Sequence, residues 1–486
     1  MRKWIYLIIP TICNTVKGIM SMKTTKNLTE GNIYKNLLFY AIPLILSSVL
    51  SQTYSLVDSV IAGKFISEHA LGAVGATSSY ETLLRSAVDG FTSGFSIYIS
   101  HLFGKKDFGR LKRDTLGMSV IMVIISVALT VLTIIFRNPI MDYLNVDDAL
   151  RGDAAIYFVV YVTGYVFFFV NLLLVRVLHA LGVTSFSIYV SLMSAFLNIG
   201  GNLLAVLVFD LGVAGLAIST IISSVAATVV YIITLRKAFR ELDGKYSGRG
   251  FDIGCFTRSW RYSVPATIQL LAFNGITFLI APPINALGAA ATTGYHIANR
   301  IYHIGTMSLW AATSAFACYT GQCVGEGNTK KIRRGIKAGF LINIALVLPF
   351  VLGIVIFAKP IVSLFFPDGH TGGAYSFAFR YASLWLPFIL VQLVGHILHA
   401  YMRSLGRVNT VLWITVLGVT TRLCTTIWLI PAMSLDGAFL GQIISWAIDA
   451  AVSILICFYF YRTDEHLLRV IEGRRRKKML SENNKS

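Results

Sequence analysis

The stretch TLGMSVIMVIISVALTVLTIIF, residues 115–136, decides the fold class of this 486-residue chain. It contains no charged side chain and is long enough to cross a bilayer as a helix, which takes about 20 apolar residues. Lysine and arginine residues precede it at positions 105–113, and Arg137 follows it directly. An uncharged helix between basic ends is typical of a membrane-spanning segment.

The composition of the whole chain agrees with this interpretation. Hydrophobic residues make up 55% of the chain and charged residues 13%, whereas a soluble domain has about 25% charged residues. These values exclude an ordinary cytosolic enzyme, a disordered chain and a secreted disulfide scaffold. The six cysteines are scattered and show neither a zinc-binding spacing nor a disulfide framework.

Twelve apolar stretches of this kind follow one another along the chain, and the quoted one is the third. The predicted spans are 36–60, 72–102, 115–136, 154–175, 184–207, 213–235, 263–282, 290–319, 338–358, 377–400, 408–431 and 437–461. We therefore predict an all-α polytopic membrane protein with twelve transmembrane helices.

The distribution of charge predicts how these spans are oriented. The 42 lysines and arginines outnumber the 23 acids, for a formal net charge of +19. Such a balance can indicate a nucleic-acid partner, but most of the basic residues lie in alternate connections between spans. These connections are residues 1–35, 105–113, Arg176, 236–261, 330–337, 403–407 and 462–486. Basic connections stay cytoplasmic, so we predict a cytoplasmic-membrane protein with both termini inside, in contact with lipid and without nucleic acid.

Short sequence elements recur in the same order in the two halves of the chain, which indicates an internal duplication. The corresponding elements are 70–73 and 286–289, 104–113 and 325–334, 181–182 and 405–406, and Pro43 and Pro265. Six spans per half preserve orientation, so we predict two pseudo-symmetric six-helix lobes. The predicted segments are a cytoplasmic N-terminal segment (1–35), an N-lobe (36–235), an interlobe linker (236–262), a C-lobe (263–461) and a basic cytoplasmic tail (462–486).

Several motifs in the first half resemble those of the MATE (multidrug and toxic compound extrusion) transporters. They are Asn27-Leu28-Thr29-Glu30-Gly31, Ile42-Pro43, SLVDSVIAG at 55–63 and ALGAVG at 70–75. The resemblance covers roughly residues 27–460 and is greatest to the DinF-like bacterial and archaeal branch. It implies a twelve-helix, two-lobe antiporter that exports organic, often cationic, compounds in exchange for H⁺ or Na⁺.

The resemblance also implies an ion-coupling site in the N-lobe. In the DinF-like branch this site uses an Asp of the first span with an Asn and an Asp of the fifth. Asp58 and Asn198 fit this pattern, whereas Asn202 stands where the second acid would be. Asn198 and Asn202 are one turn apart on a helix and share a face.

These residues also have structural interpretations. A carboxylate at Asp58 can bind Na⁺ or a proton, but it can also form a cap or an ion pair at the outer interface. The Asn198 and Asn202 pair can complete a cation site or form hydrogen bonds between helices. Pro43 removes a hydrogen bond from the first span and predicts a helix bend there.

Glu81, Arg85 and Asp89 recur every four residues and form one stripe on the second span. The favoured interpretation is an internal salt-bridge ladder that neutralises the helix. The alternative is that Glu81 or Asp89 faces a cavity and binds a proton or a cationic substrate.

The second half has basic rather than acidic residues within its spans. Its seventh and tenth spans hold no Asp or Glu, unlike those of the NorM-like and eukaryotic branches. The basic residues are Arg300, Arg380, Arg422, His296, His303, His396 and His399. They can pair with the acids of the second span or bind an anionic group. We predict no metal site at His396 and His399, because the sequence places no carboxylate near them.

No nucleotide-binding or metalloprotease motif occurs in the chain, so we expect a transporter and not an enzyme, with no cofactor besides the coupling ion. The predicted function is a secondary antiporter of the multidrug type, acting as a monomer on small organic substrates. The alternative is a flippase for lipid-linked oligosaccharides in the same superfamily, which an arginine-rich cavity would favour.

Overall fold

The computed structural model describes residues 25–61, 65–66, 68–144, 146, 148–242, 254–366 and 372–483. All regular structure within these ranges is helical. This follows from the apolar composition, because a helix satisfies its backbone hydrogen bonds internally and so tolerates hydrocarbon.

The first half of the chain contains eight helices in its described residues. They are α2 (Ile33–Ile61), α3 (Glu68–Gly104), α4 (Phe108–Ile135), α5 (Arg137–Tyr143), α6 (Asp148–Thr163), α7 (Tyr165–Ala180), α8 (Phe186–Leu207) and α9 (Gly212–Glu241). The helices α6 and α7 form one span that bends by 48° at Gly164.

The second half follows the same plan. Its helices are α10 (Gly254–Asn285), α11 (Ala289–Glu326), α12 (Thr329–Ile356), α13 (Ala358–Ser363), α14 (Gly373–Arg380), α15 (Ile389–Ser404), α16 (Val408–Met433) and α17 (Leu435–Asn483). A π turn, η2 (Tyr381–Trp385), and a 3₁₀ turn, η3 (Leu386–Phe388), join α14 to α15. Pro387 lies in this irregular stretch, where its missing N–H does not interrupt a regular helix.

The predicted all-α membrane fold is confirmed. Among the described residues, nine helical segments are long and apolar enough to cross a membrane, and the bent pair of α6 and α7 adds a tenth. The two remaining predicted spans correspond to α3 and α11, which are 37 and 38 residues long and carry charged residues such as Glu81 and Arg300. Each predicted span therefore corresponds to one long helical segment.

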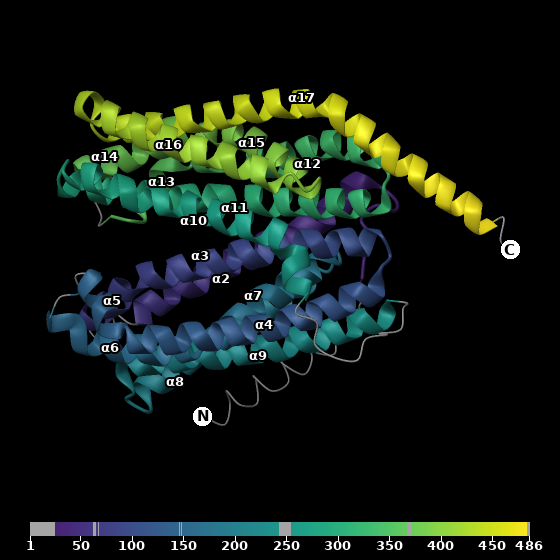
Figure 1. Ribbon diagram of the computed structural model, residues 1–486. Coiled ribbons are helices and arrows are strands. Elements are labelled where there is room, and N and C mark those ends of the chain that lie inside the picture. Colours follow the sequence, from purple (N-terminus) through teal and green to yellow (C-terminus); the bar gives the residue numbers. More distant parts are fainter. Residues whose placement is uncertain are drawn as a thin grey trace. The chain divides into compact units, whose positions relative to one another are not determined.

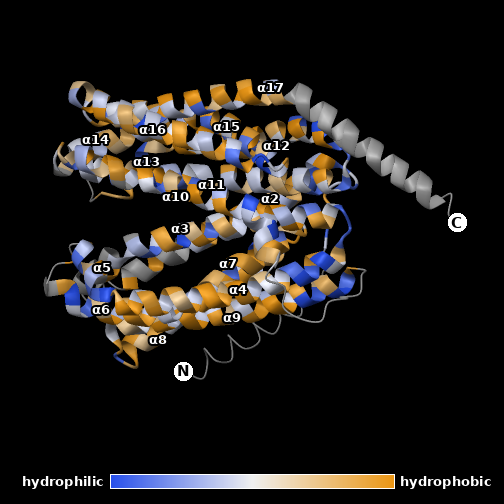
Figure 2. Cartoon of the chain, in the orientation of Figure 1, coloured by the Kyte–Doolittle hydropathy of each residue, from blue (hydrophilic) through white to orange (hydrophobic). Residues whose placement is uncertain are grey.

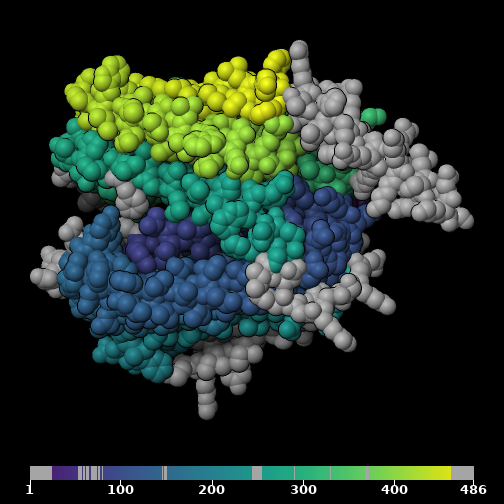
Figure 3. All heavy atoms as spheres, viewed as in Figure 1, coloured from purple at the N-terminus to yellow at the C-terminus, as the bar shows by residue number. Residues whose placement is uncertain are grey.

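Large apolar side chains lie on the outside of these helices. Trp413, Trp428 and Phe458 are 70%, 78% and 71% exposed, respectively. Hydrophobic residues cover the outer faces of α4, α9 and α17 (Figure 2). The side chains of α16 and α17, which run side by side in Figure 1, form one continuous layer in Figure 3. Exposed apolar surface of this extent indicates contact with lipid.

The recurring element at 104–113 and 325–334 has the same role in both halves. The side chain of Asp107 accepts a hydrogen bond from the backbone N–H of Arg110 and caps the start of α4. Asn328 accepts one from the N–H of Lys331 and caps the start of α12. A short polar side chain at this position satisfies a backbone donor that the helix leaves unpaired, which explains why the repeat is visible in the sequence.

The chain divides into two compact units. Unit 1 contains Met1–Lys26, Ile42–Ile99 and Asp107–Ser263, and unit 2 contains Asn27–Ala41, Ser100–Lys106 and Val264–Ser486. The division passes through α2 immediately before Ile42-Pro43 and through α10 immediately before Val264-Pro265. Pro43 and Pro265 are therefore each the second residue after a boundary between the two units.

A buried ion pair joins three helices of unit 1. Asp114 of α4 is fully buried, and the guanidinium of Arg258 in α10 donates to both of its carboxylate oxygens, at 2.7 and 3.1 Å. The hydroxyl of Tyr98 in α3 donates to Asp114 Oδ2 at 2.6 Å. Arg258, from the predicted linker, is therefore part of a fixed contact between helices.

The segment Asn27–Ala41 is held in unit 2 by a cluster that we name the N-terminal clasp: Asn27, Leu28, Thr29, Gln322, Glu326 and Lys331. The backbone N–H of Leu28 donates to Gln322 Oε1 at 2.9 Å. The hydroxyl of Thr29 donates to the carboxylate of Glu326, and the Lys331 ammonium lies 2.9 Å from that carboxylate. The Asn27–Gly31 motif therefore contacts the end of α11 and the start of α12.

The charge of Glu326 stabilises the clasp. This residue lies beyond the predicted span 290–319, at the last position of α11. Partial burial alone would raise its pKa, but hydrogen bonds from Thr29 and Lys331 and the positive charge of Lys331 outweigh this effect and lower the pKa below 4.5. A carboxyl group whose pKa is lowered by folding stabilises the folded state only while it is ionised.

We predict that Glu326→Gln lowers the unfolding free energy by about 1–3 kcal/mol at pH 7, because the clasp loses its charge-assisted hydrogen bonds. The difference in unfolding free energy between the variant and wild type should reach its full size above pH 4.5. It should disappear as the pH falls through the lowered pKa of Glu326. Thermal unfolding in detergent between pH 3 and 8 measures this difference. The control is Asp210→Asn, which removes an exposed carboxylate outside the clasp. Equal unfolding temperatures for Glu326→Gln and wild type at pH 7 would contradict the prediction.

Candidate functional site

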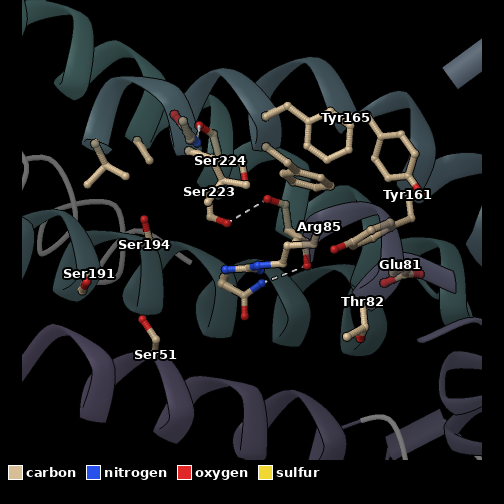
Figure 4. A pocket seen from close by; sticks show the side chains of 18 of the residues that line it. Ser51, Glu81, Thr82, Arg85, Tyr161, Tyr165, Ser191, Ser194, Ser223 and Ser224 are labelled. Carbon is tan, nitrogen blue, oxygen red and sulfur yellow. Dashed lines mark hydrogen bonds between the residues drawn. The ribbon is translucent and has the colours of Figure 1, made fainter. Parts of the chain in front are cut away.

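Unit 1 encloses a cavity of about 670 Å³, which we name the N-cavity. Its lining comes from α2, α3, α6, α7, α8 and α9 and includes Ser51, Gln52, Ser78, Glu81, Arg85, Tyr157, Tyr161, Tyr165, Phe168, Phe169, Asn171, Asn198, Thr220 and Ser223. Serine hydroxyls and aromatic rings share this surface (Figure 4). Pockets that bind small organic molecules range from about 300 to 1,000 Å³, so the N-cavity has the volume for such a ligand.

Glu81 is the acidic residue among those that line the N-cavity. Its carboxylate accepts hydrogen bonds from the hydroxyls of Thr77, at 3.4 Å, and Tyr161. Arg85 lies one turn further along α3, is exposed, and extends into the same cavity (Figure 4). The N-cavity therefore presents one carboxyl group, held mainly by neutral hydroxyl groups, with the guanidinium of Arg85 one turn away.

Aromatic rings of α6 and α7 form one wall of the N-cavity. The rings of Tyr157 and Tyr161 stack with centroids 5.5 Å apart, and those of Tyr161 and Phe168 are 4.9 Å apart. Tyr165 and Phe169 stack at 5.0 Å. These distances fall in the range of favourable ring pairs, so the rings fix one another in position beside Glu81.

The amide pair of α8 lies against α9. Asn198 lines the N-cavity and donates to the hydroxyl of Thr220 at 3.1 Å. Asn202 is fully buried, and its amide nitrogen lies 3.5 Å from Asn198 Oδ1. The side chain of Asp58 lies outside the part of the chain that the structure describes. Its helix, α2, contributes Ser51 and Gln52 to the same cavity, and Pro43 lies inside this helix.

The stripe on α3 does not form a continuous ladder among the described residues. Asp89 pairs with Arg176 of α7, whose Nε and Nη2 lie 3.0 and 2.6 Å from Asp89 Oδ1. The charge pattern predicted that Arg176 belongs to a connection after the span 154–175, but α7 continues past it to Ala180. Asp89 therefore joins two helices of unit 1, and Glu81 and Arg85 are the members of the stripe that face the N-cavity.

Unit 2 contains a much smaller cavity, of about 70 Å³, which we name the C-cavity. Its lining includes Gln269, Phe273, Trp310, Gln392, His396, His399, Arg403, Arg422, Trp446 and Asp449. Arg422 Nη2 lies 3.4 Å from the hydroxyl of Tyr295. Two other arginines lie elsewhere: Arg380 pairs with Asp436 at 2.5 Å, and Arg300 is exposed. His296 and His303 are also exposed.

One prediction made from the sequence is wrong. It placed no carboxylate near His396 and His399, but Asp449 Oδ1 of α17 lies 3.3 Å from His399 Nε2. The two residues are 50 positions apart, and only the packing of α15 against α17 brings them together. The signal that could have found this pair is Gly395, because a small residue beside two histidines indicates close approach of another helix. Within the described residues, no group of three or more potential ligands could hold a metal ion.

The comparisons with known proteins agree with this architecture. The MatE family model matches residues 43–204 and 265–428, so one model describes both halves, each from its corresponding proline onward. The chain is 25% identical to the probable multidrug resistance protein YoeA of Bacillus subtilis, across 90% of this chain and 95% of YoeA. It is 24% identical to the probable multidrug resistance protein YpnP of the same organism, across 85% of this chain and 91% of YpnP.

A solved structure has the same fold. A MOP superfamily transporter from Pyrococcus furiosus Vc1 superposes with a TM-score of 0.83, covering 92% of this chain and all of that one, at 19% identity.

We predict that Asp89→Asn and Arg176→Gln each destabilise the protein by about 1–3 kcal/mol, because each leaves the other charge without its partner inside the membrane. The double variant should be more stable than the sum of the two single effects indicates. Thermal unfolding in detergent of the four proteins measures this coupling. Strictly additive effects would show that the ion pair contributes nothing to stability.

Proposed function

The chain belongs to the MatE family, and from this premise we propose that it is a secondary antiporter that exports organic compounds across the cytoplasmic membrane. The observation that carries the proposal is the N-cavity of about 670 Å³, lined by Glu81 and aromatic rings. The names of the relatives YoeA and YpnP as probable multidrug resistance proteins support the same direction of transport. The family match favours export over the flippase alternative.

We propose organic cations as the substrate class. A cation in the N-cavity would gain Coulomb attraction from an ionised Glu81 and interactions with the rings of Tyr161 and Phe168. Serine and threonine hydroxyls complete the lining and bind polar groups of different shapes without a fixed charge pattern. A surface of rings and hydroxyls around the carboxyl group of Glu81, with Arg85 at its side, suits ligands that share aromatic character but not shape.

The coupling ion would bind at Asp58 with Asn198 and, behind it, Asn202. This assignment rests on the family resemblance and on the position of Asn198 in the N-cavity wall. Ion binding at Asp58 from the outer side would drive substrate release, and Pro43 gives α2 a place to bend. The positive-inside pattern supports cytoplasmic termini for a monomeric transporter in lipid.

We predict that Asp58→Asn reduces ion-driven efflux of a cationic dye to the background of empty membranes, while the protein still inserts and folds. The amide keeps the shape of the carboxylate but does not ionise, so it removes the coupling charge. The measurement is dye transport in everted vesicles with and without Na⁺ at two pH values. Asp210→Asn is the control, because Asp210 lies in an exposed turn with φ 50°, which asparagine tolerates. Wild-type efflux in Asp58→Asn would contradict the coupling assignment.

We predict that Glu81→Gln weakens binding of cationic dyes about tenfold, which corresponds to about 1.4 kcal/mol, and leaves neutral compounds of similar size unaffected. The physical reason is the loss of the negative charge from a cavity whose other contacts remain. Binding titrations of the purified protein with matched cationic and neutral dyes measure the ratio. An equal loss for both classes would assign Glu81 to packing and not to charge recognition.

A further inference from the structure

The C-cavity holds ionisable groups that the proposed coupling at Asp58 does not use. Its volume of about 70 Å³ corresponds to about two water molecules at about 30 Å³ each. Pockets for organic molecules begin at about 300 Å³. The size of the C-cavity therefore restricts its ligand to water, a proton or a small ion.

The carboxylate of Asp449 is held closely by two neighbouring helices of unit 2. His399 Nε2 lies 3.3 Å from Asp449 Oδ1, and the two side chains are 7% and 18% exposed. On α15, a Cβ atom at position 395 would lie 2.3 Å from Asp449 Oδ2, so a side chain there would require the carboxylate to move. On α16, the corresponding distance from Gly418 to Oδ1 is 3.7 Å. The packing of both helices thus accommodates an acid at position 449.

His396 adds a second imidazole one turn from His399. The amide nitrogen of Gln392 lies 3.2 Å from His396 Nε2 and 2.7 Å from the hydroxyl of Tyr302. Gln392 therefore holds the His396 ring in position beside His399. The ring of Trp310 lies edge-on to that of His396, with centroids 4.6 Å apart.

Two guanidinium groups, two imidazoles and one carboxylate lie in the wall of the C-cavity. The ionisable groups around Asp449 and His399 are His396 and Arg403 from α15, Arg422 from α16 and Tyr302 from α11. Arg422 and Asp449 carry opposite charges in the same cavity wall, and Arg422 Nε, buried, makes no hydrogen bond among the described residues. With those two charges offsetting each other, gain or loss of one proton on the imidazole changes the net charge by one.

We propose that Asp449 and His399, with His396 beside them, form a second proton-binding site of the transporter, located in its C-terminal half. A proton enters from water onto the His399 imidazole, which then forms an ion pair with Asp449, and it returns to water when the pair separates. The proposal rests on the proposed antiport function for its role in transport, but proton binding itself does not depend on that function. It assigns the carboxylate of α17 a role that neither the family match nor the N-cavity supplies.

The chemistry of the C-cavity favours a proton over a metal ion. Na⁺ prefers a shell of several oxygen ligands, as hard cations do in general. Here the nitrogen groups of His396, His399 and Arg422 stand beside a single carboxylate, and the guanidinium repels any added cation. An imidazole next to a carboxylate, in contrast, exchanges protons readily near neutral pH.

Proton binding can be measured without transport. In the purified full-length protein, we expect the emission of Trp310 to change with pH between 5 and 8, because the indole lies against His396, and protonation of His399 one turn away changes the charge next to that ring. This component is identified as the part of the pH response that Trp310→Phe removes. In Asp449→Asn and in His399→Gln, we predict that the midpoint of this Trp310-dependent transition moves by about one pH unit or more, or that the transition is lost. In His303→Gln, which changes an exposed histidine outside the C-cavity, it should stay as in wild type. If the titrations of the wild type, Asp449→Asn, His399→Gln and His303→Gln superimpose, the proposal is overturned.

Transport then tests the role of the site. In proteoliposomes, uptake of a cationic dye driven by a pH gradient should fall at least tenfold in Asp449→Asn and stay at the wild-type level in Asp210→Asn. Exchange of labelled for unlabelled dye without a gradient should persist in Asp449→Asn, which separates a loss of proton coupling from a loss of folding. Unchanged pH-driven uptake in Asp449→Asn would overturn the role in coupling. If the wild type moves no dye under any gradient, the proposed function fails, and the fluorescence titration still decides whether the proton site exists.

Discussion

The cost of placing an ionised side chain in hydrocarbon governs much of this structure. Asp89 meets that cost by pairing with Arg176. Asp114 lies just before the predicted span 115–136 but is fully buried, and it pairs with Arg258; both pairs join helices of the same unit. Neutralising a charge therefore also fixes one helix against another. Glu81 differs, because the groups that donate to it are neutral hydroxyls and it faces a cavity of about 670 Å³. A carboxylate of this kind remains available to a cationic ligand.

The helices and their duplication could be predicted from the sequence because both depend on local features. A span is a run of apolar residues, and the long segments from α2 to α17 lie where these runs are. Asp107 and Asn328 recur because each caps the helix that follows it, which is a contact within a few residues. The position of Asn198 on a polar face of α8 follows from helical periodicity in the same way.

The partners of the charged residues could not be predicted, because hydropathy places a residue in the membrane without indicating which helix it faces. Arg176 looked like an orientation charge at the edge of a span, and Asp449 had no visible partner in its own helix. The extent of the two units also depends on distant contacts. Hydrogen bonds from Asn27, Leu28 and Thr29 to α11 associate the start of the first half with unit 2, although the linker at 236–262 suggested a division there.

The N-terminal clasp has a consequence for any attempt to divide the chain at the linker. A fragment ending near residue 242 would carry Asn27–Ala41 and Ser100–Lys106 without the helices on which they pack, since these belong to the second half. The complementary fragment would present the polar groups of Gln322, Glu326 and Lys331 without their partners. Coexpressed fragments could restore these contacts by assembling with each other, whereas either fragment alone lacks them. The duplicated halves are therefore repeats in sequence but obligate complements in assembly.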